Sequence, residues 1–281
     1  MKRWLRRAGA RLAPERLKSR VRGRLYGYKR SRMKLAFSVS NDESGLFILI
    51  DNRIKLYVTK DDLDDFTFHF VSNGASIEEM YGFVKAADTA RTLFDVGAHK
   101  GLFSLVFCGC NQANKAIAYE PSPSLVRGAE KLARMNWFQS RISLEPFAIG
   151  DKRDIVTASL DSSEFIRFGS EENRDQEIDV QMTTLDEECS RLGIYPDIVK
   201  IDIEGYEHEA LLGARDMLKR KKPVICLELH LDLLEQRGIN PRIICNDLQG
   251  YGYQFFSYEG RRMAARDVYD SIDAVFRFIA T

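Results

Sequence analysis

The hydrophobic pattern of the chain changes character several times. Two β-type runs, Leu46–Ile50 and Ile54–Val58, are joined by three polar residues, a pattern typical of a hairpin. Apolar residues at helical spacing follow between Ile77 and Ala87. We therefore expect residues 36–90 to form a small N-terminal cap that consists of a β-hairpin and a helix.

After Arg91, apolar runs of strand length recur at intervals that suit a repeating βα unit. Helical spacing lies between most of these candidate strands, which are Thr92–Val96, Lys115–Tyr119, Ile142–Ala148, Ile198–Ile203, Val224–Leu229, Tyr253–Tyr258 and Ala274–Ile279. Such alternation predicts an α/β domain over residues 91–281, with a Rossmann-like, mostly parallel sheet and helices on both faces. One helix is expected from about Glu207 to Lys219. The last two runs lack a clear helix between them, which predicts an antiparallel pair at one edge.

Basic residues are concentrated at the N-terminus, although the net charge of the whole chain is only +1. Residues 1–34 hold fourteen Lys and Arg and one acid, Glu15, and so carry +13, whereas the rest carries −12. Apolar residues at helical spacing, interrupted by Pro14, predict a basic amphipathic arm over residues 1–35. This arm could bind an anionic membrane surface or RNA, or be a solvated extension that binds neither. A mitochondrial presequence also fits its composition.

The composition of the whole chain is that of a globular protein, with 44% hydrophobic residues. Five cysteines without C-x-x-C spacing favour buried reduced thiols over a disulfide framework or a zinc site. No apolar run approaches the length of a membrane span, and no apolar segment of signal-peptide type follows the charged start. We therefore expect a cytoplasmic protein, peripheral at the membrane if the arm binds lipid.

The segment FDVGAHKG, residues 94–101, carries the most information about a ligand. It lies where the first strand of the α/β domain ends, so that Gly97 and Gly101 allow a sharp turn and Asp95 presents a carboxylate. The spacing differs from the G-x-G-x-x-G of dinucleotide sites, and an acid at this turn would repel phosphate. It suits a cofactor with a positively charged amino group, such as S-adenosyl-L-methionine. A purely structural turn is the alternative.

Further acids stand at the ends of later strands. Glu120 follows the second strand, where a carboxylate can accept hydrogen bonds from ribose hydroxyls; its alternative role is to cap a helix or face solvent. Asp202 and Glu204 follow one buried strand, while Glu228 and His230 end the next one and face the same side by strand alternation. These side chains could bind a cation, orient a hydroxyl or accept a proton. No recognised ligand spacing is present, so a divalent metal is allowed but not predicted.

Taken together, several segments resemble the FkbM-type family of S-adenosylmethionine-dependent methyltransferases. They are DVGAHKG (95–101), YEPSPS (119–124), FAIGD (147–151), TTLDEE (183–188), VKIDIEGYEHEALLGA (199–214) and LELH (227–230). The resemblance covers about residues 91–258 and leaves out the arm and the cap. His99 stands where the family usually has Asn, which puts one contact to the cofactor's methionine end in doubt. Asp151 corresponds to a position near the adenine ring, although Gly150-Asp151 is also an ordinary turn.

The resemblance implies a class I fold and methyl transfer to the oxygen of a sugar, polyketide or lipid-linked glycan. An alcohol acceptor requires a general base, for which Asp202 and His230 are the first candidates and Glu204 and Glu228 the next. The cofactor contacts would come from Asp95, Gly97, His99, Gly101, Glu120 and Asp151. Two alternatives are an RNA methyltransferase, which the negative body disfavours, and a cofactor-binding scaffold without catalysis. The oligomeric state is not predicted.

Overall fold

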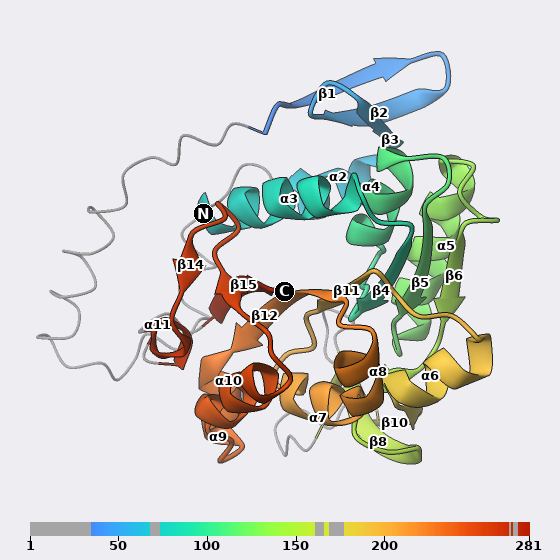
Figure 1. The fold of residues 1–281 in the computed structure, drawn as a ribbon. Coiled ribbons are helices and arrows are strands. Elements are labelled where there is room, and N and C mark those ends of the chain that lie inside the picture. Colours follow the sequence, from blue (N-terminus) through green and yellow to red (C-terminus); the bar gives the residue numbers. More distant parts are fainter. Residues whose placement is uncertain (1–34, 68–73, 161–165, 169–176, 270, 272–274) are drawn as a thin grey trace, which may run out of the picture. The chain divides into compact units, whose positions relative to one another are not determined.

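The computed structural model describes residues 35–67, 74–160, 166–168, 177–269, 271 and 275–281 (Figure 1). The chain divides into two compact units, residues 1–34 and residues 35–281. The first unit lies outside the described residues, so the predicted helices of the basic arm stay a prediction. Within the described part of the chain, no helix combines the length and the apolar character needed to cross a membrane.

An eight-stranded sheet forms the centre of the second unit, in the order β14-β13-β15-β12-β11-β4-β5-β6. Its strands are β4 (Thr92–Val96), β5 (Lys115–Tyr119), β6 (Ile142–Glu145), β11 (Ile198–Ile201), β12 (Val224–His230), β13 (Phe255–Phe256), β14 (Arg262–Met263) and β15 (Val275–Ala280). The five strands from β6 to β12 are parallel, whereas β15 runs antiparallel to β12 and β13. The predicted Rossmann-like sheet with antiparallel strands at one edge is confirmed.

Helices cover both faces of this sheet, as Figure 1 shows. They are α2 (Lys60–Thr67), α3 (Gly74–Ala87), α4 (Leu102–Cys110), α5 (Pro123–Met135), α6 (Leu185–Leu192), α7 (Glu207–Leu212), α8 (Arg215–Arg220), α9 (Leu231–Gln236), α10 (Pro241–Gly250) and α11 (Ala265–Tyr269). Strand alternation divides the interior into two cores: Leu93 of β4 packs with α3, α4 and α5, while Phe94 packs with α6, α7, α8 and α10. All five cysteines are free thiols, and four of them are buried.

The N-terminal segment forms its own antiparallel sheet of β1 (Phe37–Asp42), β2 (Gly45–Ile50) and β3 (Ile54–Tyr57). The predicted hairpin is β2 and β3, while β1 was not predicted. Buried isoleucines of β2 and β3 pack in the same core as α4. The Asn136 side chain also accepts from the backbone N–H of Tyr57 at 2.7 Å and donates to its carbonyl at 2.9 Å. The segment predicted as a cap therefore shares its core with the domain that follows.

Two predicted elements are interrupted in the structure, and the predicted strands Ile198–Ile203 and Tyr253–Tyr258 are shorter, as β11 and β13. The run Ile142–Ala148 is split, because Pro146 lacks the N–H that a continuous ladder needs. Its second part, β7 (Ala148–Ile149), joins an outer sheet in the order β7-β10-β8-β9, with β8 (Asp154–Leu160), β9 (Ile166–Phe168) and β10 (Glu177–Thr183). The expected single helix from Glu207 to Lys219 is α7 and α8. It breaks at Gly213, which passes so close to the carbonyl of Gly150 that a Cβ would lie 2.0 Å from that oxygen.

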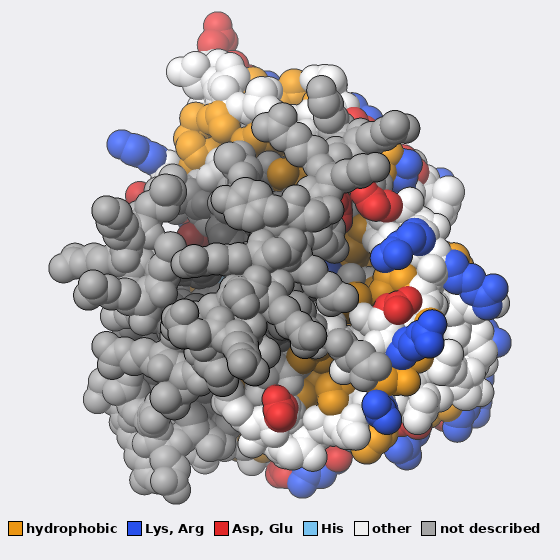
Figure 2. Space-filling view, turned by 90° about the vertical axis from the view of Figure 1, so that its left-hand side faces the viewer, with side chains coloured by type: hydrophobic (Ala, Val, Ile, Leu, Met, Phe, Trp, Pro, Cys, Tyr) orange, Lys and Arg blue, Asp and Glu red, His pale blue; other side chains and the backbone are white. Residues whose placement is uncertain are grey.

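The described surface carries charges of both signs. On the face in Figure 2, Lys and Arg side chains lie beside Asp and Glu, with small hydrophobic patches between them. Salt bridges such as Lys152 with Asp154, at 2.8 Å, join exposed side chains and contribute little to stability. The charges with unusual surroundings are therefore the buried ones, such as Lys200 and Glu79.

Candidate active site

The glycine turn after β4 lies against the end of the neighbouring strand. Gly97 has a φ of 81°, in the left-handed region that favours glycine. A Cβ on Gly97 would lie 1.9 Å from the backbone oxygen of Asp202, which directly follows β11. Gly101 also has a positive φ, 79°, but the nearest atom to a Cβ there is the Ala129 Cβ at 3.5 Å. Gly97 is thus required by conformation and by close approach, whereas Gly101 is required by conformation alone.

Asp95 is turned toward helix α4. Its side chain is 2% exposed, and its Oδ2 accepts hydrogen bonds from the Ser104 hydroxyl at 2.6 Å and from the Ser104 N–H at 3.1 Å. Burial raises the pKa of Asp95 to about 6. The predicted contact between Asp95 and a charged amino group stays a prediction, and the observed bonds give Asp95 a role in orienting α4.

Glu120 joins the glycine turn to the end of β5. Its Oε2 accepts from the His99 N–H and its Oε1 from the Ser122 N–H, both at 2.9 Å. The side chain is 7% exposed, and burial raises its pKa to about 7. A carboxylate has about four lone-pair sites, so each oxygen of Glu120 retains capacity for a further donor. His99 itself has a φ of 52°, which bends the backbone so that its N–H reaches Glu120.

Asp151 follows a strand of the outer sheet. It is exposed and lies directly after β7, which belongs to that sheet rather than to the central one. Its predicted place near an adenine ring stays a prediction.

A buried lysine stands behind the second group of acids. Lys200 of β11 is 1% exposed, and its Nζ lies 3.2 Å from Glu79 of α3, 3.3 Å from Asp202 and 3.8 Å from Glu228. Burial lowers the pKa of Lys200, but the carboxylates around it raise the pKa by more, so the ammonium stays charged. Arg277 of β15 completes the group.

Arg277 binds two of these carboxylates. Its Nε lies 2.8 Å from Glu228 Oε2 and 3.2 Å from Glu79, and its Nη2 donates to Glu228 Oε1. Burial and the charges of Asp202 and Glu79 raise the pKa of Glu228 to about 8. The Asp202 side chain is 28% exposed. Burial raises the pKa of Asp202, but the positive charges of Lys200, His230 and Arg277 lower it by more, to about 2.

His230 brings together the four residues predicted to carry catalysis. Its Nε2 lies 3.8 Å from Asp202 Oδ1, 3.6 Å from Glu204 Oε2 and 3.8 Å from Glu228 Oε1. Its Nδ1 lies 2.8 Å from Oε1 of Glu207, the first residue of α7. Burial lowers the pKa of His230, but Glu207, Asp202 and Glu204 raise it to about 9. Glu207 was not predicted, because the alternation that places strand residues does not extend into the helix.

Three of these residues could contribute ligands to a metal. Asp202, Glu228 and His230 offer ligand atoms within 4.8 Å of one another. Lys200 and Arg277 already lie against the same carboxylates, so an added cation would compete with two fixed positive charges. We therefore interpret the cluster as an acid–base site.

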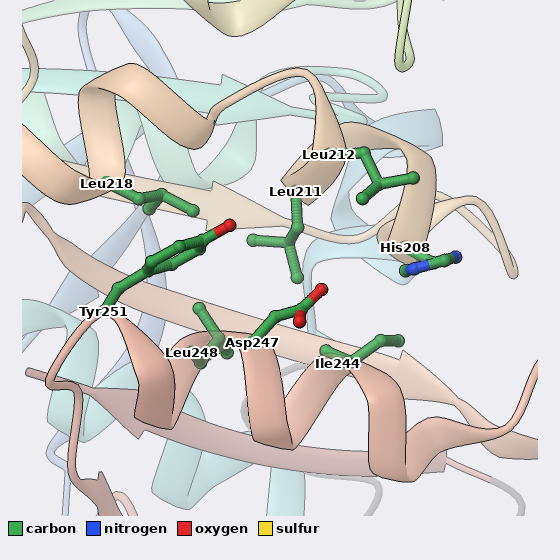
Figure 3. Close-up of a pocket in the computed structure, with 8 residues that line it drawn as sticks. All are labelled: His208, Leu211, Leu212, Leu218, Ile244, Asp247, Leu248 and Tyr251. Carbon is green, nitrogen blue, oxygen red and sulfur yellow. The ribbon is translucent and has the colours of Figure 1, made fainter.

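A separate small cavity lies between α7, α8 and α10 (Figure 3). Its volume is about 10 Å³, which suits one water molecule. His208 and Asp247 face it from opposite helices, among the side chains of Leu211, Leu212, Leu218, Ile244, Leu248 and Tyr251. The cavity is too small for a cofactor or an acceptor.

The profile of the methyltransferase FkbM domain matches residues 95–255, more than half of the chain. The chain belongs to this FkbM family. The resemblance predicted from the motifs is confirmed, and the matched range contains every residue predicted to contact cofactor or acceptor. A comparison with curated proteins finds no match.

Solved structures with similarity to this FkbM chain are methyltransferases of low sequence identity. The methyltransferase FkbM from Methylobacillus flagellatus is 20% identical, with a TM-score of 0.46 over 69% of this chain and 43% of that chain. The O-methyltransferase from Bacillus cereus in complex with SAH is 10% identical, with a TM-score of 0.39 over 80% and 91%. The ribosomal protein L11 methylase from Lactobacillus delbrueckii subsp. bulgaricus is 14% identical, with a TM-score of 0.42 over 74% and 77%. This chain thus matches less than half the length of the Methylobacillus protein.

The two glycines of the turn allow a paired test. Gly97→Ala is expected to lower the free energy of unfolding by more than about 3 kcal/mol, because a left-handed alanine costs roughly 1–2 kcal/mol and the Asp202 carbonyl must also move. Gly101→Ala carries only the conformational cost, about 1 kcal/mol. Urea unfolding of both variants measures the difference. Equal losses would show that the close approach to Asp202 contributes nothing.

Proposed function

We propose that the chain is an S-adenosyl-L-methionine-dependent O-methyltransferase. Its acceptor would be a hydroxyl group of a sugar in a glycan, of a lipid-linked acceptor or of a secondary metabolite. The supporting observation is the His230 Nε2, which lies within 3.8 Å of two carboxylates that follow β11 and one that belongs to β12. Such an arrangement can accept a proton from an alcohol, and it occurs in a chain of a methyltransferase family.

The residues at the ends of β4 and β5 fit this cofactor. Glu120 retains lone pairs for the two hydroxyls of a ribose. Burial raises the pKa of Asp95 and of Glu120. A bound cation and hydroxyl donors would lower both pKa values again, because they stabilise the ionised carboxylates. When bound, S-adenosyl-L-methionine supplies an electrophilic methyl group on a sulfonium.

The residues at the ends of β11 and β12 would orient and deprotonate the acceptor. Asp202, with its pKa of about 2, is ionised and can accept a hydrogen bond from the acceptor hydroxyl. However, a carboxylate with so low a pKa is a poor proton acceptor. His230 in its neutral form can take the proton at Nε2, since Asp202 and Glu204 stabilise the resulting imidazolium. General base catalysis typically contributes about 10²–10⁴-fold.

The pH dependence of the rate tests this assignment. Since the pKa of His230 is about 9, only a minority is neutral at pH 7, and kcat/KM should rise up to about pH 9 and then level off. His230→Asn should lower kcat by about 10²–10⁴-fold. The control is His208→Asn, which alters the histidine beside the small cavity.

These rates are measured across a panel of sugar nucleotides, lipid-linked glycans and RNA. A flat profile between pH 6 and 9 would instead assign the proton to Asp202. Cofactor binding without turnover of any acceptor would support a scaffold, and turnover of RNA alone would overturn the choice of acceptor.

Glu120 tests the cofactor site separately. Glu120→Gln should weaken S-adenosyl-L-methionine binding at least about 10-fold, because the amide nitrogen cannot accept from a hydroxyl and would face a backbone N–H. Isothermal titration calorimetry measures the affinity. Glu130→Gln, on the exposed side of α5, is the control. Unchanged affinity in Glu120→Gln would place the ribose elsewhere.

We also propose that the basic arm binds an anionic membrane and keeps the enzyme at the cytoplasmic surface. Residues 1–34 carry +13, and each Lys or Arg near such a surface adds about 1 kcal/mol. The full chain should sediment with phosphatidylserine vesicles and not with phosphatidylcholine vesicles, and deletion of residues 1–34 or added salt should abolish this. The negative body disfavours RNA, and tighter binding of the arm to RNA than to vesicles would overturn the proposal.

A further inference from the structure

Glu207 is a fully buried acid that contacts two parts of the candidate site. Its Oε1 accepts from the Gly205 N–H at 2.9 Å and lies 2.8 Å from His230 Nδ1. Its Oε2 is buried and has no hydrogen-bond partner among the described residues. A buried carboxylate with one oxygen unpaired costs free energy. A neutral side chain at this position would cost less free energy, which indicates that the acid has a function.

The backbone that leads to Glu207 is itself strained. Glu204, which is not a glycine, has a φ of 52°, and Gly205 follows with a φ of 94°. The N–H of Gly205 is the group that donates to Glu207 Oε1. One carboxylate oxygen therefore ties the loop that carries Glu204, after β11, to His230 at the end of β12.

We infer that Glu207 is a positioning residue for His230. It holds the proton on Nδ1, turns Nε2 toward the acceptor side and supplies charge that stabilises the imidazolium. This inference rests on the proposed function, in which Nε2 takes the proton of the acceptor hydroxyl. Glu207 would not touch the acceptor, because its side chain is 0% exposed.

The charged groups around His230 form two sets, according to the ring nitrogen that they face. Glu207 of α7 contacts Nδ1, while Asp202 after β11, Glu204 in the loop and Glu228 of β12 face Nε2. The cations Lys200 and Arg277 contact Asp202, Glu228 and Glu79. Burial lowers the pKa of His230, and the hydrogen bond to Glu207 is the largest effect that raises it. Removal of the Glu207 charge should therefore change the titration of His230 itself.

Glu207→Gln removes the charge and keeps a carbonyl oxygen that can accept from Nδ1–H. The pKa of His230 should fall by about 1–2 units, and the pH at which the rate levels off should move down by the same amount. Nitrogen NMR of labelled histidine gives the titration without any need for activity. The control is Glu209→Gln on the same helix, whose carboxylate pairs with Arg237 and should leave His230 unchanged.

The wild-type chain provides a measurement that no folding defect can obscure. Above the pKa of His230, its nitrogen shifts should report a proton on Nδ1 and a lone pair on Nε2. The opposite tautomer, or a His230 titration that Glu207→Gln does not move, would overturn the positioning role. A moved titration with an unmoved rate profile would leave that role intact and reject His230 as the base of the proposed reaction.

Discussion

The candidate site depends on the buried ammonium of Lys200. Three carboxylates, from α3, β12 and the end of β11, lie within 3.8 Å of its Nζ, and the Phe103 ring lies 4.8 Å away. Three acids so close together, two of them buried, would repel one another strongly without such a cation, and this repulsion would add to the cost of burial. Loss of Lys200 would leave Glu79 and Glu228 to Arg277 alone. The lysine thus makes it possible for the acids of the site to lie side by side.

The same cluster separates the protonation states of its members. Asp202 is next to Lys200 and stays ionised, with a pKa of about 2, while His230 faces four carboxylates and has a pKa of about 9. Opposite pKa shifts in neighbouring groups allow one residue to orient a hydroxyl and the other to accept its proton. The opposite pKa shifts arise from the positions of the cations. Lys200 and Arg277 contact the carboxylates, and no cation among the described residues pairs with the imidazole.

The sequence allowed part of this site to be predicted. Asp202, Glu228 and His230 were placed together because the carboxyl ends of parallel strands meet at one edge of a sheet. Glu79 and Arg277 were missed, since α3 and β15 lie far away in sequence and only the three-dimensional packing brings them to Lys200. Strand alternation also says nothing about the first turn of the following helix, where Glu207 stands. The outer sheet was missed for a related reason: Pro146 ends one ladder, and the short strand after it pairs with distant β10.

Backbone contacts link the two halves of the site. The turn at Gly97 lies against the Asp202 carbonyl, and the His99 N–H two residues later binds Glu120. The segment predicted to hold the cofactor therefore contacts the proposed acid–base cluster through main-chain atoms at the strand ends. Main-chain atoms at such ends are more rigid than the tips of long side chains, so the distance between the two halves is set by the sheet itself. In the proposed reaction, methyl transfer would depend on that distance, because catalysis by proximity is sensitive to displacements of about 1 Å.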